Sequence, residues 1–154
     1  MLAARTPRNQ RGAIAVEFAL VMLPLVVLIF GAIQYGLYFW AMQGGSDIAR
    51  DAARVAAVDD ASTYACADFR SDVIDQINGL TGSASTATIT RTYLDTNTPA
   101  GVSVGDKVEV SVRFKSVDLH FPFVPFIRDG VVNSTGTARV DYVRDPNNPP
   151  VNCS

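Results

Sequence analysis

The longest apolar run in the chain lies near its N-terminus. Residues 13–34 contain a single charged side chain, Glu17, and a helix over this run would extend about 33 Å at ~1.5 Å per residue. A hydrocarbon core is about 30 Å thick, so the run is long enough to cross a bilayer. Pro24 removes one helical hydrogen bond and predicts a kink, which membrane helices tolerate.

Beyond residue 42 the helix is predicted to continue to about residue 58 and to break at residues 59–60. Small residues recur at every fourth position of this part: Gly45, Ala49, Ala53 and Ala57. Such a stripe allows a neighbouring backbone to approach closely. It packs either on the chain's own sheet alone, which the composition favours, or on the sheet and a neighbouring subunit together.

A second helix is predicted over residues 62–78, with Gly79 as its C-terminal stop. Apolar side chains follow the spacing of one buried helical stripe at Cys66, Phe69, Val73, Ile77 and Leu80. The opposite side carries Asp68, Asp72 and Asp75. Because these aspartates lack the dense oxygen pattern of a calcium loop, they indicate a solvated face, and no metal site is expected.

Three strands are predicted at residues 87–94, 107–117 and 131–143. The second strand is the clearest, because Val108, Val110, Val112 and Phe114 alternate with polar residues. That alternation predicts one buried and one solvated face. Residues 97–101 form a predicted loop between the first two strands. The fold class expected is α+β: a long N-terminal transmembrane helix, a second helix and a small antiparallel sheet.

The segment between the second and third strands, residues 120–126, reads His-Phe-Pro-Phe-Val-Pro-Phe. Two prolines prevent it from being an interior strand. Its phenylalanines either fold back as a lid on the core, which we favour, or stay exposed as a docking patch.

The segments on the two sides of the apolar run differ in charge. Arg5, Arg8 and Arg11 precede it without any acid, and the rest of the chain carries ten basic and fifteen acidic residues. The basic leader predicts a cytoplasmic N-terminus and an extracytoplasmic remainder. The acidic remainder argues against a nucleic-acid partner. A chain of 154 residues leaves room for one modest domain after the apolar run.

The two cysteines, Cys66 and Cys153, both fall on the extracytoplasmic side of this topology. An oxidising compartment favours a bridge between them, with two free thiols as the alternative. Such a bridge would close a loop of 87 residues, worth roughly 4–5 kcal/mol in the chain-entropy model.

The start of the apolar run carries a processing motif. Gly12 follows the basic leader, and Glu17 and Phe18 are the fifth and sixth residues after it. This arrangement resembles the class III signal of type IV pilin-like proteins. The resemblance implies cleavage between Gly12 and Ala13 by a membrane prepilin peptidase, with the apolar helix kept as the assembly helix. A secretory signal would instead lose its apolar region.

With the small-residue helix and the β-rich tail that follow, the chain resembles the TadE/TadG-like family of the Tad (Flp, tight-adherence) pilus. The resemblance implies a minor pilin or pseudopilin of the bacterial inner membrane that acts in pilus assembly and adherence. It implies a leader (residues 1–12), a transmembrane helix (13–42) and an extracytoplasmic domain (43–154). The expected partners are prepilin peptidase, other pilins and pseudopilins, the inner-membrane assembly platform and membrane lipid.

Two features of the helix have competing interpretations. Glu17 either pairs with the α-amine that cleavage would create on Ala13, in its own or a neighbouring chain, or lies at the headgroup boundary without a role. Tyr35, Tyr38 and Trp40 form either an interfacial aromatic belt, which their position favours, or ordinary packing.

No catalytic constellation is present in the sequence. A Walker loop, a dinucleotide fingerprint, a nucleophile elbow and a zinc-ligand cluster are all missing, and the only histidine is His120. We therefore expect no catalytic residues and no cofactor. The alternative to a pilin is an uncleaved, single-pass anchored adhesion or sensor module. A membrane-tethered hydrolase has no supporting motif.

Overall fold

The structure, a computed structural model, describes residues 10–58, 65–82, 86–94, 102–122, 124–125, 127–143 and 151–153. The predicted break at residues 59–60, the predicted start of the second helix and the loop at residues 97–101 lie outside this part. The elements are α1 (Gln10–Val58), α2 (Cys66–Thr81), β1 (Thr88–Leu94), β2 (Lys107–Lys115), a short 3-10 helix η1 (Ile127–Gly130) and β3 (Val131–Arg139). The predicted α+β class is confirmed.

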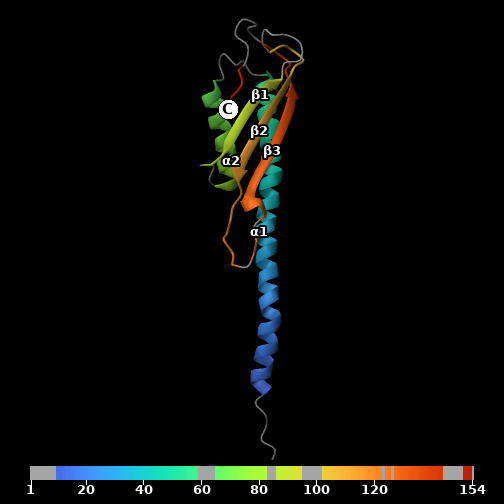
Figure 1. The fold of residues 1–154 in the computed structure, drawn as a ribbon, viewed down its shortest axis with the longest axis vertical. Coiled ribbons are helices and arrows are strands. Elements are labelled where there is room, and N and C mark those ends of the chain that lie inside the picture. Colours follow the sequence, from blue (N-terminus) through green and yellow to red (C-terminus); the bar gives the residue numbers. More distant parts are fainter. Residues whose placement is uncertain are drawn as a thin grey trace, which may run out of the picture.

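Helix α1 has 49 residues and passes through Pro24 without interruption. At ~1.5 Å per residue it is about 73 Å long. Figure 1 shows that the N-terminal turns of α1 project beyond the domain, while its C-terminal half lies against the sheet, with α2 beside it. The chain is therefore a long helix with a small domain built on its second half.

The sheet is antiparallel with the strand order β1-β2-β3. Strands β2 and β3 end earlier than predicted, at Lys115 and Arg139, because the backbone beyond them bonds elsewhere. The carbonyl of Val117 accepts a hydrogen bond from Gln34 of α1. After β3, the amide of Val140 donates to Asp106, and the amide of Asp141 donates to Ala57 of α1.

One face of the sheet forms the core. The predicted alternation in β2 is confirmed, since Val108, Val110, Val112 and Phe114 are all buried. The predicted stripe of α2 is confirmed as well, and it packs into the same core at Phe69, Val73 and Ile77. The other face of the sheet carries polar side chains such as Ser111 and Thr135. The domain therefore has two layers, helices and sheet.

The small residues of α1 face the chain's own sheet, as the composition favoured. Ala49, Ala53 and Ala57 are buried, and a Cβ placed on Gly136 of β3 would collide with the backbone oxygen of Ala49. Gly45 similarly approaches the ring of Phe114, which would lie 2.8 Å from an added Cβ. The stripe is thus the seam along which α1 and the sheet meet.

Helix α2 does not stop at Gly79, as the sequence predicted. It continues to Thr81, and Gly82 ends it in the left-handed conformation with φ of 73°. The Gly82 amide donates to the Asn78 carbonyl at 2.7 Å, which closes the last turn. Gly79 is a helical position with open space around it. Both glycines fit the preference for glycine just after the end of a helix, and the helix ends at the one that adopts positive φ.

Candidate functional site: the protruding half of α1 and its attachment to the domain

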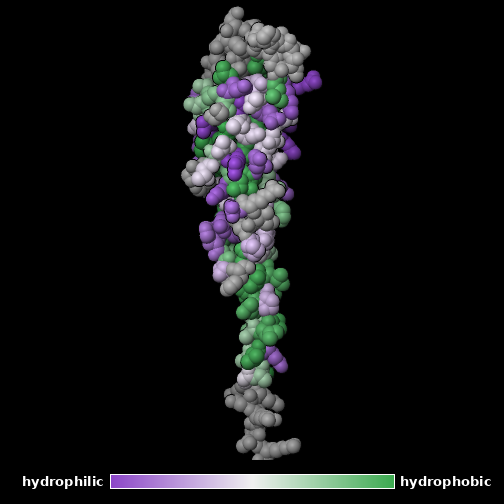
Figure 2. All heavy atoms as spheres, in the orientation of Figure 1, coloured by the Kyte–Doolittle hydropathy of each residue, from purple (hydrophilic) through white to green (hydrophobic). Residues whose placement is uncertain are grey.

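The N-terminal half of α1 exposes apolar side chains on all sides. Leu20 and Leu28 are 73% and 70% exposed, and the most apolar 18-residue window of this helix has no residue buried against the rest of the chain. Figure 2 shows this half as a predominantly hydrophobic column below a more polar domain. Among the described residues α1 is the one helix long and apolar enough to cross a membrane. An apolar surface of this size requires a nonaqueous partner.

The four residues singled out for processing and assembly lie together at the start of this column. Gly12, Ala13, Glu17 and Phe18 are all helical and exposed. A Cβ placed on Gly12 would meet no atom within 4 Å. Glu17 lies one helical turn after Ala13, and no described residue forms an ion pair with it. The structure therefore presents these residues to the surroundings of the helix.

A polar residue fastens the domain to this helix. Gln34 is only 2% exposed. Its Nε2 donates to the carbonyl of Val117 at 3.0 Å, and its Oε1 accepts the amide of Leu119 at 3.0 Å. Both partners belong to the chain just after β2. Gln34 was not among the predicted site residues, because it marks the end of the apolar run; the signal in the sequence is a lone amide side chain within a long apolar helix.

The segment after β2 then turns toward the N-terminal half of α1. Phe121 stacks on Phe30 with ring centroids 4.5 Å apart, and the Tyr35 hydroxyl donates to the Pro125 carbonyl at 2.7 Å. The predicted lid on the core is therefore wrong for Phe121, whose ring packs on α1 instead of the sheet. The side chains of residues 123 and 126 lie outside the described part.

The predicted aromatic belt is also corrected in part. Tyr38 is 6% exposed and belongs to the core, so it is not an interfacial side chain. Tyr35 is half-buried and holds the segment after β2. Only Trp40, at 52% exposure, and its neighbour Phe39 remain on the surface. The rest of the chain therefore covers two of the three aromatic residues, Tyr35 in part and Tyr38 almost completely.

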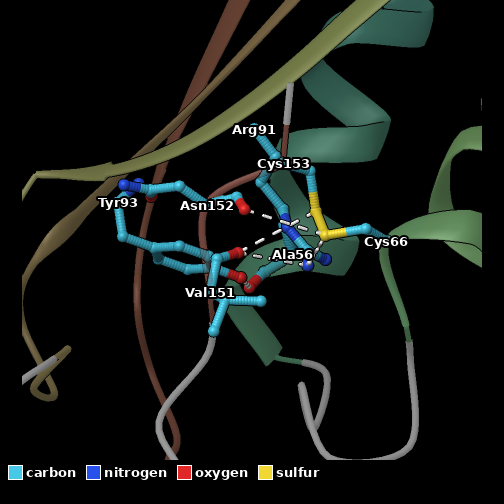
Figure 3. The surroundings of a disulfide bond; sticks show 7 residues. All are labelled: Ala56, Cys66, Arg91, Tyr93, Val151, Asn152 and Cys153. Carbon is cyan, nitrogen blue, oxygen red and sulfur yellow. Dashed lines mark hydrogen bonds between the residues drawn. A yellow bond between two sulfur atoms is a disulfide. The ribbon is translucent and has the colours of Figure 1, made fainter.

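At the opposite end of the domain, the structure joins Cys66 and Cys153 by a disulfide, with Cα atoms 5.7 Å apart (Figure 3). Residues 151–153 lie beside β1, where Arg91 and Cys153 exchange two backbone hydrogen bonds of 2.8 Å. The Asn152 side chain accepts the Tyr93 amide at 2.7 Å. The bridge therefore fixes the C-terminal segment as a short addition to the sheet and links it to the start of α2.

Arg91 is buried under this bridge, with 1% of its surface exposed. Its guanidinium lies 4.6 Å from the ring centre of Phe69 and 5.6 Å from that of Tyr93. One of its terminal nitrogens donates to the Val151 carbonyl at 3.4 Å. Arg91 was not among the predicted site residues, although its place between Ile89 and Tyr93 in an alternating strand points it inward.

The acidic residues of α2 remain on the surface. Asp68, Asp72 and Asp75 are exposed, and no group of three potential metal ligands occurs in the described part of the chain. These aspartates occupy the solvated face that the sequence predicted for them.

Comparison with known families adds one observation. Residues 12–54 match the family model of TadE-like proteins. The match begins at Gly12 and ends four residues before the end of α1, so it covers the exposed apolar column and most of the seam with the sheet. It includes less than a third of the 154 residues.

The resemblance to TadE-like proteins read from the sequence is confirmed over that segment. It suggests a protein associated with the Tad pilus that interacts with other pilus components, and TadE-like proteins are in general not enzymes. The single exposed apolar helix suggests a single-pass membrane anchor. No curated protein and no solved structure matches the chain.

Proposed function

We propose that this chain is a minor pilin-like, nonenzymatic component of a Tad pilus, which acts in pilus assembly and surface adherence. In this proposal α1 anchors it in the bacterial inner membrane, with a cytoplasmic N-terminus and the α+β domain in the extracytoplasmic space. One observation carries the proposal: the helix that matches TadE-like proteins is apolar and exposed over its first half and packs into the core of a domain with its second half. Such a helix suits a subunit that first resides in lipid and then moves out of it and packs against other helices.

Processing would prepare the helix for assembly. A prepilin peptidase would cut between Gly12 and Ala13, which removes the three arginines of the leader. Both residues are exposed on the helix, and Gly12 offers a backbone without a side chain to a peptidase cleft. The product keeps the apolar column and carries a new positive charge at its end.

Glu17 would then act in register selection. The α-amine of Ala13 and the Glu17 carboxylate are separated by about 6 Å along the helix axis at ~1.5 Å per residue. A charge in lipid without a partner is costly, and an opposite charge nearby compensates that cost. Because the amine of the same chain is held at the helix start, a neighbouring subunit shifted by about one turn offers a better partner. The partners in this step are other pilins and pseudopilins on the inner-membrane assembly platform.

The first experiment measures processing. The intact mass of the membrane-extracted protein should correspond to an N-terminus at Ala13, and Gly12→Val should retain the leader. Gly36→Val is the matched control, because Gly36 is also a helical glycine with open space around it; it should mature normally. A wild-type protein that keeps Met1 would refute processing and favour the uncleaved adhesion or sensor module.

The second experiment measures assembly. Glu17→Leu should insert into the membrane normally and lose crosslinks to partner pilins, since only the charge pairing is removed. Val16→Leu, at the neighbouring exposed position, should retain them, and membrane fractionation controls for insertion. If Glu17→Leu crosslinks to partner pilins and supports piliation at wild-type levels, Glu17 is only an interfacial residue.

A further inference from the structure

The segment between β2 and β3 reaches α1 at a position that would lie inside a bilayer. Measured from Ala13 at ~1.5 Å per residue, Phe30 lies about 26 Å along the helix and Gln34 about 32 Å, against a hydrocarbon thickness of about 30 Å. Phe121 stacks on Phe30. If the hydrocarbon layer begins at Glu17 instead of Ala13, Phe30 lies farther from the boundary on the side of the domain. The contact between Phe30 and Phe121 therefore lies within the hydrocarbon layer, and the two hydrogen bonds of Gln34 lie next to the boundary of that layer.

Helix α1 also satisfies several polar groups of this segment. Gln34 bonds the carbonyl of Val117 and the amide of Leu119, and the Tyr35 hydroxyl bonds the carbonyl of Pro125. Nonhelical backbone is tolerated at membrane depth only where protein or water satisfies its polar groups. Two prolines, Pro122 and Pro125, remove two further amide donors. Contacts with α1 therefore satisfy three polar groups of this segment, and the two prolines lower the number of amides that need a partner.

Between this segment and the helix runs an apolar groove of about 950 Å³. Its walls come from Met22, Val26 and Phe30 of α1 and from Pro122 and Val124 of the segment. All of the described residues that line it are apolar. The groove lies along the part of α1 that would cross the membrane, between Phe18 and Phe30, so it opens into the surroundings of that helix.

We propose that Phe121, Pro122 and Val124 insert into the leaflet on the side of the domain, and that the groove holds a phospholipid acyl chain. The inference rests on the membrane placement of α1 in the proposed function, and on neither cleavage nor assembly. A lipid chain is the occupant because the groove continues the lipid-facing surface of α1 without a polar break. The domain thereby contacts the bilayer at two places, the helix and this segment, which fixes its orientation on the membrane.

Spin labelling of the unprocessed full chain in phosphatidylcholine–phosphatidylglycerol vesicles, with no other pilin present, tests this placement. Both native cysteines are in the disulfide, so a cysteine introduced elsewhere is the free thiol to be labelled. Three variants are compared: Val124→Cys in the segment, Leu23→Cys in the apolar column and Val104→Cys in the turn before β2. The measurement is collision of the label with oxygen, which concentrates in lipid, against collision with a water-soluble nickel chelate.

We expect the label at Val124 to give the high oxygen-to-nickel ratio of the label at Leu23, and the label at Val104 to give a low ratio. A Val124 ratio that equals the Val104 ratio, while Leu23 reports lipid, would overturn the insertion and leave the proposed function intact. A Val124 label shielded from both reagents and broadened by a second spin would show another copy of the chain in the groove, which also overturns the lipid assignment. A low oxygen-to-nickel ratio for the label at Leu23 would overturn the membrane placement of α1, and both proposals with it.

Discussion

Gly136→Ala tests whether close contact between α1 and the sheet holds the domain on its helix. Gly136 lies in the middle of β3, opposite Val110 of β2. A Cβ at this position would collide with the Ala49 carbonyl, and the Arg50 nitrogen would lie at 2.6 Å. Both contacts are backbone atoms of a long helix, so no side chain can rotate to make room. The helix and the strand would have to separate.

The expected cost follows from the geometry. Gly136 does not have positive φ, so its backbone accepts alanine without strain, and the loss comes from overpacking alone. Overpacking of a well-packed site typically costs about 1–3 kcal/mol. That range corresponds to roughly a 5- to 150-fold shift in the unfolding equilibrium, at about 1.4 kcal/mol per factor of ten.

Equilibrium unfolding of the full chain in urea and a mild detergent, followed by near-ultraviolet circular dichroism, measures the effect. Gly79→Ala is the matched control, because Gly79 lies inside α2 with open space around it. It should raise stability by about 0.5–1 kcal/mol, as alanine does when it replaces glycine in a helix. Equal stability of Gly136→Ala and the wild type, beside a stabilised Gly79→Ala, would refute the close-contact argument.

Three further substitutions probe the attachments of the domain. Gln34→Leu should increase hydrogen exchange of the Leu119 amide, because that amide loses its acceptor, whereas the exposed Gln43→Leu should leave it unchanged. Cys66→Ser should cost about 2–5 kcal/mol of unfolding free energy in urea titrations, as expected for a bridge across 87 residues; an unchanged midpoint would contradict this. Arg91→Ala should cost about 2–5 kcal/mol, as truncation of large buried side chains does, while the exposed Arg113→Ala should stay within about 0.5 kcal/mol.

The elements of this fold could be predicted wherever one periodicity continues long enough. The apolar helix, the stripe of α2 and the alternation of β2 each repeat over several turns or pairs, so single exceptions do not obscure them. Element ends were less predictable, because they depend on tertiary partners. Gly79 and Gly82 both fit a helix stop, and only the conformation of Gly82 distinguishes them.

The pattern alone does not show which partners Gln34 and Arg91 bind. Gln34 and Arg91 are polar residues in apolar positions, and a polar residue in such a position can mark either an element end or a buried hydrogen-bonding group. Gln34 is buried because backbone after β2, more than eighty positions later, satisfies its amide. Arg91 is buried because aromatic rings from α2 and β1 receive its guanidinium. Both depend on long-range contacts that the local sequence does not encode.

These attachments determine how the domain responds when α1 changes its surroundings. Gln34 binds the chain just after β2 at the end nearest the exposed column, Gly136 meets Ala49 in the middle, and the Ala57 carbonyl accepts the Asp141 amide at the far end. The domain is thus fixed to α1 at three positions along the helix. A rotation or axial shift of α1 must carry the sheet with it, because the attached stretch is one continuous helix. The packing of the exposed column therefore sets the direction in which the open, polar face of the sheet points.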